Sequence, residues 1–228
     1  MTTRQPSRTR IKICGICTLD TAQAAADAGA DAIGLVFVEA SPRCVSLETA
    51  REIVQALPPM VEPVGLFCDA SLGYVIDTAN AVGLRTVQLH GNETCDDAAA
   101  LHPLRVIKAL PFHAPQGPAV IPEALAGWID PPPSVAGLLL DTPRQPDSQL
   151  TGGSGHAFDW DALANVPRQN LPPIILAGGL TPGNVRAAIE TVKPYAVDVS
   201  SGVESQRGVK DVEKIKAFCA AVREAHGL

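Results

Sequence analysis

Residues that could do chemistry follow shortly after short apolar segments of the chain. They are Cys14, Arg43, Asp69, His90, Lys108, Asp141, Gly178-Gly179 and Ser200-Ser201-Gly202. Thiols, carboxylates and imidazoles can exchange protons with a substrate. Glycine-rich segments let the backbone approach an anion such as phosphate closely. Whether these groups act together depends on whether the fold brings the ends of the apolar segments to one place.

Eight such segments, rich in β-branched residues, alternate with helical patterns. We expect strands at residues 11–14, 31–37, 62–67, 85–89, 105–108, 137–140, 174–177 and 195–199. Strands that alternate with helices form a parallel sheet, because parallel neighbours need a crossover connection. Eight units predict a single-domain α/β fold, a closed (β/α)₈ TIM barrel, in preference to an open doubly wound sheet. In such a barrel the carboxyl ends of the strands form the active-site face.

The helical patterns carry start signals. Thr18 and Ser46 precede two of them as capping residues, and Thr181-Pro182 is expected to begin another. After the fifth strand a Pro-rich stretch leaves room only for a short helix at about residues 122–128. This stretch does not separate two domains, because strand–helix units lie on both sides of it.

Composition and charge exclude several classes of function. The 228 residues carry 18 basic and 24 acidic side chains, and 4% of them are aromatic. Nucleic-acid binding relies on a basic face and on stacking aromatic rings, so no nucleic-acid partner is expected. No apolar segment reaches the ~20 residues of a membrane span, and no signal peptide is visible. We therefore expect a cytoplasmic protein without a membrane partner, with residues 1–10 as a disordered polar tail and residues 11–228 as the catalytic barrel.

The spacing of Cys14 and Cys17 allows a different interpretation. A Cys-x-x-Cys pair between a strand and a helix is typical of thiol-redox proteins. That interpretation would leave most of the chain unexplained, and a zinc site would need a second pair of ligands. A thiol-redox protein is therefore the less favoured alternative.

Eight short motifs follow one another in a fixed order from residue 11 to residue 220. They are Lys12-Ile13-Cys14-Gly15, Ser41-Pro42-Arg43-Cys44-Val45, Val87-Gln88-Leu89-His90-Gly91, Leu138-Leu139-Leu140-Asp141, Gly152-Gly153-Ser154-Gly155 with Phe158-Asp159-Trp160, Leu176-Ala177-Gly178-Gly179-Leu180, Val197 to Glu204, and Gly208-Val209-Lys210-Asp211. Together they resemble the phosphoribosylanthranilate isomerase family of tryptophan biosynthesis. Another phosphosugar-processing barrel enzyme is the main alternative, because the glycine-rich motifs would suit it equally well.

The resemblance implies an Amadori rearrangement of N-(5′-phosphoribosyl)anthranilate to 1-(2-carboxyphenylamino)-1-deoxyribulose 5-phosphate. The ring oxygen of the sugar gains a proton as the ring opens, and a proton then leaves C2′. This reaction needs one acid and one base, and no metal or redox cofactor. By resemblance, Asp141 is the acid and Cys14 is the base. Lys12 lies on the same strand face as Cys14 and is expected to favour the thiolate.

The resemblance also assigns groups that bind the substrate. Arg43 would hold the anthranilate carboxylate, which a planar guanidinium can grip in bidentate fashion. The phosphate would bind to Gly178, Gly179, Ser201 and Gly202, because the loops after the last two strands form the usual phosphate site of this architecture.

Three further features have less definite roles. His90 is expected to line the substrate pocket, and the glycines of residues 152–155 would suit a lid. Asp198 has either an orienting role or a structural hydrogen bond. The expected partner is a small phosphorylated molecule, and the expected oligomeric state is a monomer.

Overall fold

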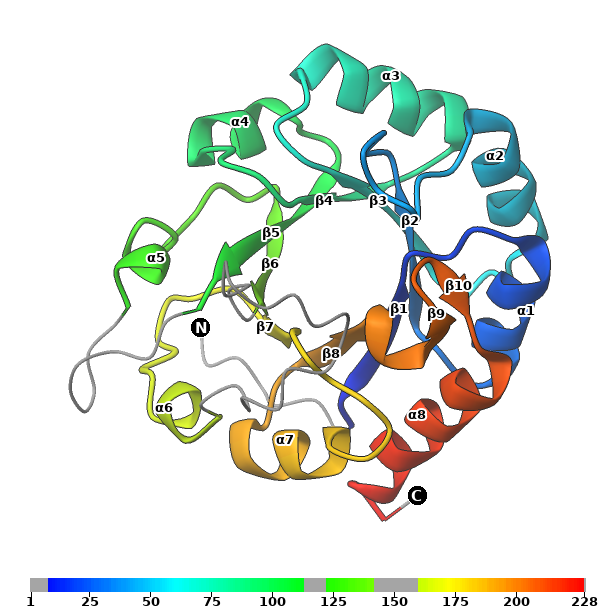
Figure 1. The fold of residues 1–228 in the computed structure, drawn as a ribbon. Helices are drawn as coiled ribbons and strands as arrows, with labels where there is room; N and C mark the ends of the chain where they lie inside the picture. Colours follow the sequence, from blue (N-terminus) through cyan, green and yellow to red (C-terminus); the bar gives the residue numbers. More distant parts are fainter. Residues whose placement is uncertain (1–7, 113–121, 142–159, 228) are drawn as a thin grey trace.

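Eight parallel strands close into a barrel, and the helices form a ring around it (Figure 1). The computed structural model describes residues 8–112, 122–141 and 160–227. Its barrel strands are β1 (Arg10–Cys14), β2 (Ala32–Val36), β3 (Glu62–Phe67), β4 (Thr86–Leu89), β5 (Arg105–Pro111), β6 (Val135–Asp141), β7 (Ile174–Leu176) and β8 (Ala196–Val199). Each pairs with its sequence neighbours, and β8 pairs with β1. The predicted closed (β/α)₈ architecture is confirmed.

The helices follow the strands one by one. They are α1 (Leu19–Asp27), α2 (Leu47–Ala56), α3 (Leu72–Val82), α4 (Cys95–Ala100), α5 (Glu123–Ala126), α6 (Trp160–Ala164), α7 (Val185–Val192) and α8 (Val212–Glu224). Between β8 and α8 the chain adds a short 3₁₀ helix, η1 (Ser201–Val203), and a hairpin of β9 (Glu204–Gln206) and β10 (Val209–Lys210). This hairpin was not expected from the sequence, and it carries two charged residues of the candidate site, Glu204 and Lys210.

The helix start signals mostly act as expected. The side chains of Thr18 and Ser46 accept hydrogen bonds from the backbone N–H groups of Thr21 and Thr49, which satisfies donors that a helix terminus leaves open. The expectation for Thr181-Pro182 was wrong by three residues, because α7 begins at Val185. Asn184 precedes it, and its side-chain oxygen accepts a hydrogen bond from the Thr181 backbone at 2.8 Å.

The folded part begins earlier than expected. Arg8 forms an ion pair with Asp31, and the Thr9 backbone N–H donates to the His226 ring at 3.0 Å. With Arg10 already in β1, residues 8–10 do not belong to a disordered tail. The rest of the expected tail lies outside the described residues.

Two apolar clusters hold the barrel together. The larger one fills the layer between strands and helices. The smaller one includes Val64, Ile107, Ala109, Leu139 and Ile175. These residues alternate along their strands with residues of the outer layer, so they fill the barrel interior, as the pleat of a small barrel requires. Polar groups that continue this inward set at the strand ends are the ones that can reach a substrate.

Within the described part of the chain, no helix combines the length and the apolar character that crossing a membrane requires.

Candidate active site

The Cys14 thiol lies at the end of β1 in a buried, charged environment. Its side chain is on the same face as Lys12, whose ammonium donates to Asp198 of β8 at 2.7 Å and also interacts with the thiol. Lys12 and Asp198 are both buried. A Cβ atom on Gly34 of β2 would come within 2.7 Å of the Cys14 sulfur. A glycine inside a strand here leaves the space that the thiol occupies.

The electrostatics of Cys14 differ from the expectation. Burial raises the pKa of the Cys14 thiol above its ordinary value, even though the ammonium groups of Lys12 and Lys210 pull it down and Asp198 adds to the rise. Lys12 thus favours the thiolate as predicted, but its effect is outweighed. Burial alone would lower the pKa of the Lys12 ammonium, but Asp198 raises it. Asp198 therefore keeps Lys12 charged beside Cys14.

Arg43 lies between β1 and the β9–β10 hairpin. Its Nε and Nη2 donate to the two carboxylate oxygens of Glu204 at 2.6 and 2.8 Å. A Cβ atom on Gly15 would come within 2.5 Å of the Arg43 Cδ, so the stem of the arginine runs closely over the turn after Cys14. One of the two guanidinium edges that can grip a carboxylate in bidentate fashion is therefore occupied by a carboxylate of the protein itself. Only the Nη1 and Nη2 end is open among the described residues.

Glu204 is the centre of a small cluster of charges. Besides Arg43, it accepts a hydrogen bond from the Lys210 ammonium at 2.7 Å and one from the Gly208 backbone at 3.2 Å. Burial would raise the pKa of Glu204, but the hydrogen bonds from Arg43 and Lys210 lower it to about 2. Burial lowers the pKa of Lys210 against the pull of Glu204. The cluster of Arg43, Glu204 and Lys210 holds two cations and one anion beside Cys14.

Asp141 ends β6 and is partly exposed at the same face. The Nε2 atom of His90 lies 3.7 Å from its Oδ2, and Nδ1 of the same ring lies 2.9 Å from Nε2 of Gln88. Gln88 is fully buried, and its Oε1 has no partner in the described part of the molecule. The buried Gln88 amide contacts the Nδ1 side of the imidazole, so the Nε2 side of the ring faces Asp141.

The loops after β7 and β8 present unpaired backbone donors. None of the N–H groups of Gly178, Gly179, Ser201 and Gly202 has an acceptor among the described residues. A Cβ atom on Gly202 would overlap the Leu180 carbonyl oxygen, so the two loops touch where they carry these donors. Adjacent free N–H groups form an anion-binding site.

Other predicted residues lie elsewhere. Lys108 is on the opposite pleat from Ile107 and Ala109, and its ammonium is held by Glu93 at 2.7 Å. Asp69 accepts a hydrogen bond from the Asn92 backbone at 2.6 Å and braces neighbouring loops. Both side chains are therefore engaged by other groups of the protein. The expected lid at residues 152–155 lies outside the described residues.

The cysteine pair does not form a disulfide. All six cysteines are free thiols, and the Cys17 sulfur contacts the backbone oxygens of Gly15 and Arg43 at 3.6 and 3.5 Å. Among the described residues no cluster of potential ligands could hold a metal ion.

Gly34, Glu204 and Lys210 were missed as site residues by the sequence analysis. A glycine within the apolar run Ala32–Val36 signals a close approach and could have pointed to Gly34. Glu204 and Lys210 belong to two of the matched motifs, but their pairing depends on a two-stranded hairpin that the pattern of residues did not predict.

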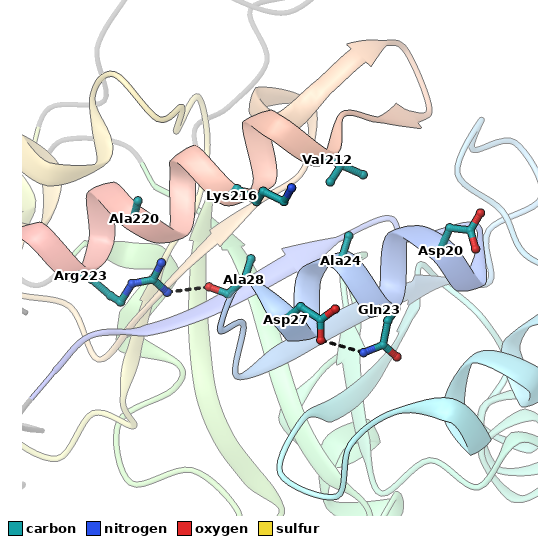
Figure 2. A pocket seen from close by; sticks show the side chains of 9 residues that line it. All are labelled: Asp20, Gln23, Ala24, Asp27, Ala28, Val212, Lys216, Ala220 and Arg223. Carbon is teal, nitrogen blue, oxygen red and sulfur yellow. Dashed lines mark hydrogen bonds between the residues drawn. The ribbon is translucent and has the colours of Figure 1, made fainter.

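A groove of about 750 Å³ runs along the outside of the barrel between α1 and α8. Figure 2 shows it lined by alanines and by Asp20, Asp27, Lys216 and Arg223, with Arg223 bonded to the Ala28 carbonyl. None of the strand-end groups lines it. The groove is therefore separate from the catalytic face.

Comparison with known proteins identifies this arrangement. Residues 11–221 match the family model of N-(5′-phosphoribosyl)anthranilate isomerase. The chain belongs to the N-(5′-phosphoribosyl)anthranilate isomerase family. The isomerase of Pseudomonas aeruginosa (strain LESB58) is 49% identical over 217 residues, covering 94% of this chain and 95% of that protein.

Solved structures of phosphoribosylanthranilate isomerases share the whole fold. One, in complex with reduced 1-(o-carboxyphenylamino)-1-deoxyribulose 5-phosphate, is 36% identical with a TM-score of 0.78, covering 96% of this chain and 100% of that one. A monomeric form of the dimeric enzyme from Thermotoga maritima is 36% identical with a TM-score of 0.77, covering 95% and 99%. As a family member, this chain is an isomerase of phosphoribosylanthranilate in tryptophan biosynthesis, which confirms the predicted enzyme class over the thiol-redox alternative.

Glu204 is expected to make folding of this isomerase sensitive to acid. Because the pKa of Glu204 falls from 4.5 in the unfolded chain to about 2, its contribution is present above pH 4.5 and is lost as the pH falls through about 2. At 1.36 kcal/mol per pKa unit, the full contribution is about 3 kcal/mol.

Urea unfolding of the wild type and of Glu204→Gln measures this contribution. The difference in unfolding free energy between them should be largest near neutral pH and shrink steadily in more acidic buffers. A difference that stayed constant down to about pH 3 would show that Glu204 is not held ionised by its partners.

Proposed function

We propose that Cys14 and Asp141 carry out the isomerisation as general base and general acid. The observation that carries this assignment is that both end barrel strands at the same face, with β7 and β8 between them. A sugar bound across this face would have one group on each side. Asp141 would protonate the ring oxygen as the ring opens, and Cys14 would then remove the proton from C2′. The resulting enolamine becomes the ketone by moving a proton from its hydroxyl to C1′, which leaves the 1-deoxyribulose product.

The Cys14 thiol must first lose its own proton. Its raised pKa means that the neutral thiol predominates in the free enzyme. The Lys12 and Lys210 ammonium groups favour the thiolate and would stabilise it once the thiol proton has passed to water. Lys12 and Lys210 thus support Cys14 as a base through their charge.

The two anionic ends of the substrate would bind on opposite sides of the reacting sugar carbons. Phosphate would accept hydrogen bonds from the free N–H groups of Gly178, Gly179, Ser201 and Gly202. The anthranilate carboxylate would bind the open end of Arg43, and His90 would line the pocket next to Asp141. We also propose that the enzyme acts as a cytoplasmic monomer.

The assignment of Arg43 is tested by Arg43→Ala. A charge-assisted hydrogen bond contributes about 1.5–3 kcal/mol, so KM for phosphoribosylanthranilate should rise about 10- to 100-fold. Steady-state kinetics that follow the fluorescence of the anthranilate ring measure this change.

Arg186→Ala is the matched control, because the Arg186 side chain is 59% exposed and forms an ion pair with Glu190 on the outer face of α7. Its KM should equal that of the wild type. If Arg43→Ala also left KM unchanged, the carboxylate would have to bind elsewhere.

A further inference from the structure

The Arg43 guanidinium is held by the Glu204 carboxylate. A guanidinium has two edges that can bind a carboxylate, one formed by Nε and one Nη, the other by both Nη atoms. Here Glu204 takes the first edge with both of its oxygens, at 2.6 and 2.8 Å. The Arg43 side chain is only 15% exposed and that of Glu204 only 4%. Arg43 is therefore fixed in direction before any substrate arrives.

Glu204 is itself braced from three sides. The Lys210 ammonium donates to its Oε1 at 2.7 Å, and this lysine is anchored in turn on the Ser200 carbonyl at 3.0 Å. The Gly208 backbone donates to Oε2, and the Lys214 ammonium donates to the Glu204 backbone oxygen at 2.7 Å. These contacts come from the β9–β10 hairpin and the start of α8. Glu204 is thus a rigid part of the wall and not a flexible surface side chain.

The hairpin also packs on the loop that carries Arg43. A Cβ atom on Gly208 would come within 2.8 Å of the Pro42 carbonyl oxygen, and one on Gly15 within 2.5 Å of the Arg43 Cδ. The arginine is enclosed between the turn after β1 and the hairpin. Two backbone segments and one carboxylate leave its side chain little freedom to turn.

Charge also matters in this arrangement. Arg43 and Lys210 would repel each other if Glu204 were neutral, and the long arginine side chain would be driven away from the lysine. With Glu204 ionised, the cluster carries one net positive charge, which a single carboxylate of the substrate neutralises. Holding a binding group in place beforehand reduces the entropy that binding costs.

We propose that Glu204 is a positioning residue that fixes Arg43 so that its open end receives the anthranilate carboxylate. This inference rests on the proposed function of Arg43. Glu204 touches neither the substrate nor the reacting atoms, and it acts through the arginine. Its loss should therefore raise KM while leaving kcat within about threefold of the wild type.

A double-mutant cycle tests the inference, with Glu204→Gln, Arg43→Ala and the double variant. Glu204→Gln should raise KM about tenfold. The double variant should have the KM of Arg43→Ala alone, because Glu204 has nothing to position once the arginine is gone. Inhibition by inorganic phosphate reports on the opposite end of the site, and its inhibition constant should stay within twofold in every variant.

The possible outcomes separate the role of Glu204 from that of Arg43. If Arg43→Ala raises KM but Glu204→Gln does not, the positioning role is wrong while the role of Arg43 stands. If Arg43→Ala leaves KM unchanged, the proposed role of Arg43 fails and the inference fails with it. If the two single changes had multiplicative effects on KM in the double variant, Glu204 would support the hairpin and not the arginine. The same conclusion would follow if Glu204→Gln weakened phosphate inhibition by as much as it raised KM.

Glu204→Asp provides the second variant should Glu204→Gln fold poorly. It keeps the charge but shortens the side chain by one methylene, so KM should lie between those of the wild type and Arg43→Ala. Glu190→Gln is the control, because Glu190 is exposed on α7 and forms an ion pair with Arg186. If Glu204→Asp had the wild-type KM, binding of substrate would not depend on a carboxylate placed directly against the Arg43 guanidinium, and the inference would be wrong.

Discussion

Replacing Cys14 by serine is expected to lower kcat by about 10²- to 10⁴-fold, the usual contribution of a positioned base. The serine hydroxyl fits the space beside Gly34 but holds its proton far more tightly than a thiol does. It can therefore not accept the C2′ proton at neutral pH. KM should change little, since Cys14 is assigned to the proton on C2′ and to neither anionic end of the substrate. Steady-state kinetics with phosphoribosylanthranilate measure both constants.

Cys95→Ser is the matched control for the loss of a thiol. Cys95 begins α4 in the outer layer, where its thiol donates to the Gly127 carbonyl and its side chain packs against the larger apolar cluster. It should retain the wild-type kcat. A Cys14→Ser enzyme with a kcat close to that of this control would require a different base.

Asp141→Asn is expected to cause a loss of similar size, about 10²- to 10⁴-fold in kcat. The asparagine amide has the shape of the carboxyl group but cannot transfer a proton to the ring oxygen. It can still lie near His90, which is 3.7 Å from the Asp141 carboxylate, so the pocket should keep its form. The loss should therefore appear in kcat and not in inhibition by inorganic phosphate.

Asp77→Asn provides the control for this substitution, because Asp77 lies exposed on α3. Full activity in Asp77→Asn and strong loss in Asp141→Asn is the expected pair of results. If both variants turned over substrate like the wild type, Asp141 would not be the acid.

The strands and their order could be predicted from the sequence because burial determines both. Six of the eight predicted segments coincide with observed strands to within one residue at each end. The two exceptions are β5, which runs on to Pro111, and β6, which begins two residues earlier than predicted, at Val135. Lys108 interrupts the apolar run within β5, and Val135 follows closely on a Pro-rich stretch, so the apolar pattern marks neither the end of β5 nor the start of β6. Capping residues such as Thr18 could be predicted equally well, since their side-chain hydrogen bonds are local and do not depend on the rest of the fold.

The electrostatics of the site could not be predicted in the same way. Lys12 was correctly placed beside Cys14, but the burial that outweighs it depends on how β2 packs, with Gly34 against the sulfur. The pair of Arg43 and Glu204 joins residues 161 positions apart, and no local pattern reveals it. Long-range pairs of this kind follow from the closed barrel and the added hairpin.

The chain carries a net charge of −6. The substrate is also anionic, so the overall field of the protein does not attract it. Under the proposed function, attraction comes from local groups at the strand ends. These are the cluster of Arg43, Glu204 and Lys210 with its one net positive charge, and the free N–H groups after β7 and β8. The pairing of Arg43 with Glu204 concentrates this attraction at one end of the guanidinium.

The most direct test of the catalytic pair is the loss of anthranilate fluorescence when purified enzyme is mixed with phosphoribosylanthranilate in the presence of a chelator. The wild type should consume the substrate without any added metal or cofactor. Cys14→Ser and Asp141→Asn should each leave the fluorescence nearly constant over the same time, although both still bind inorganic phosphate. Rapid loss of fluorescence with either variant would contradict the assignment of Cys14 as base and Asp141 as acid.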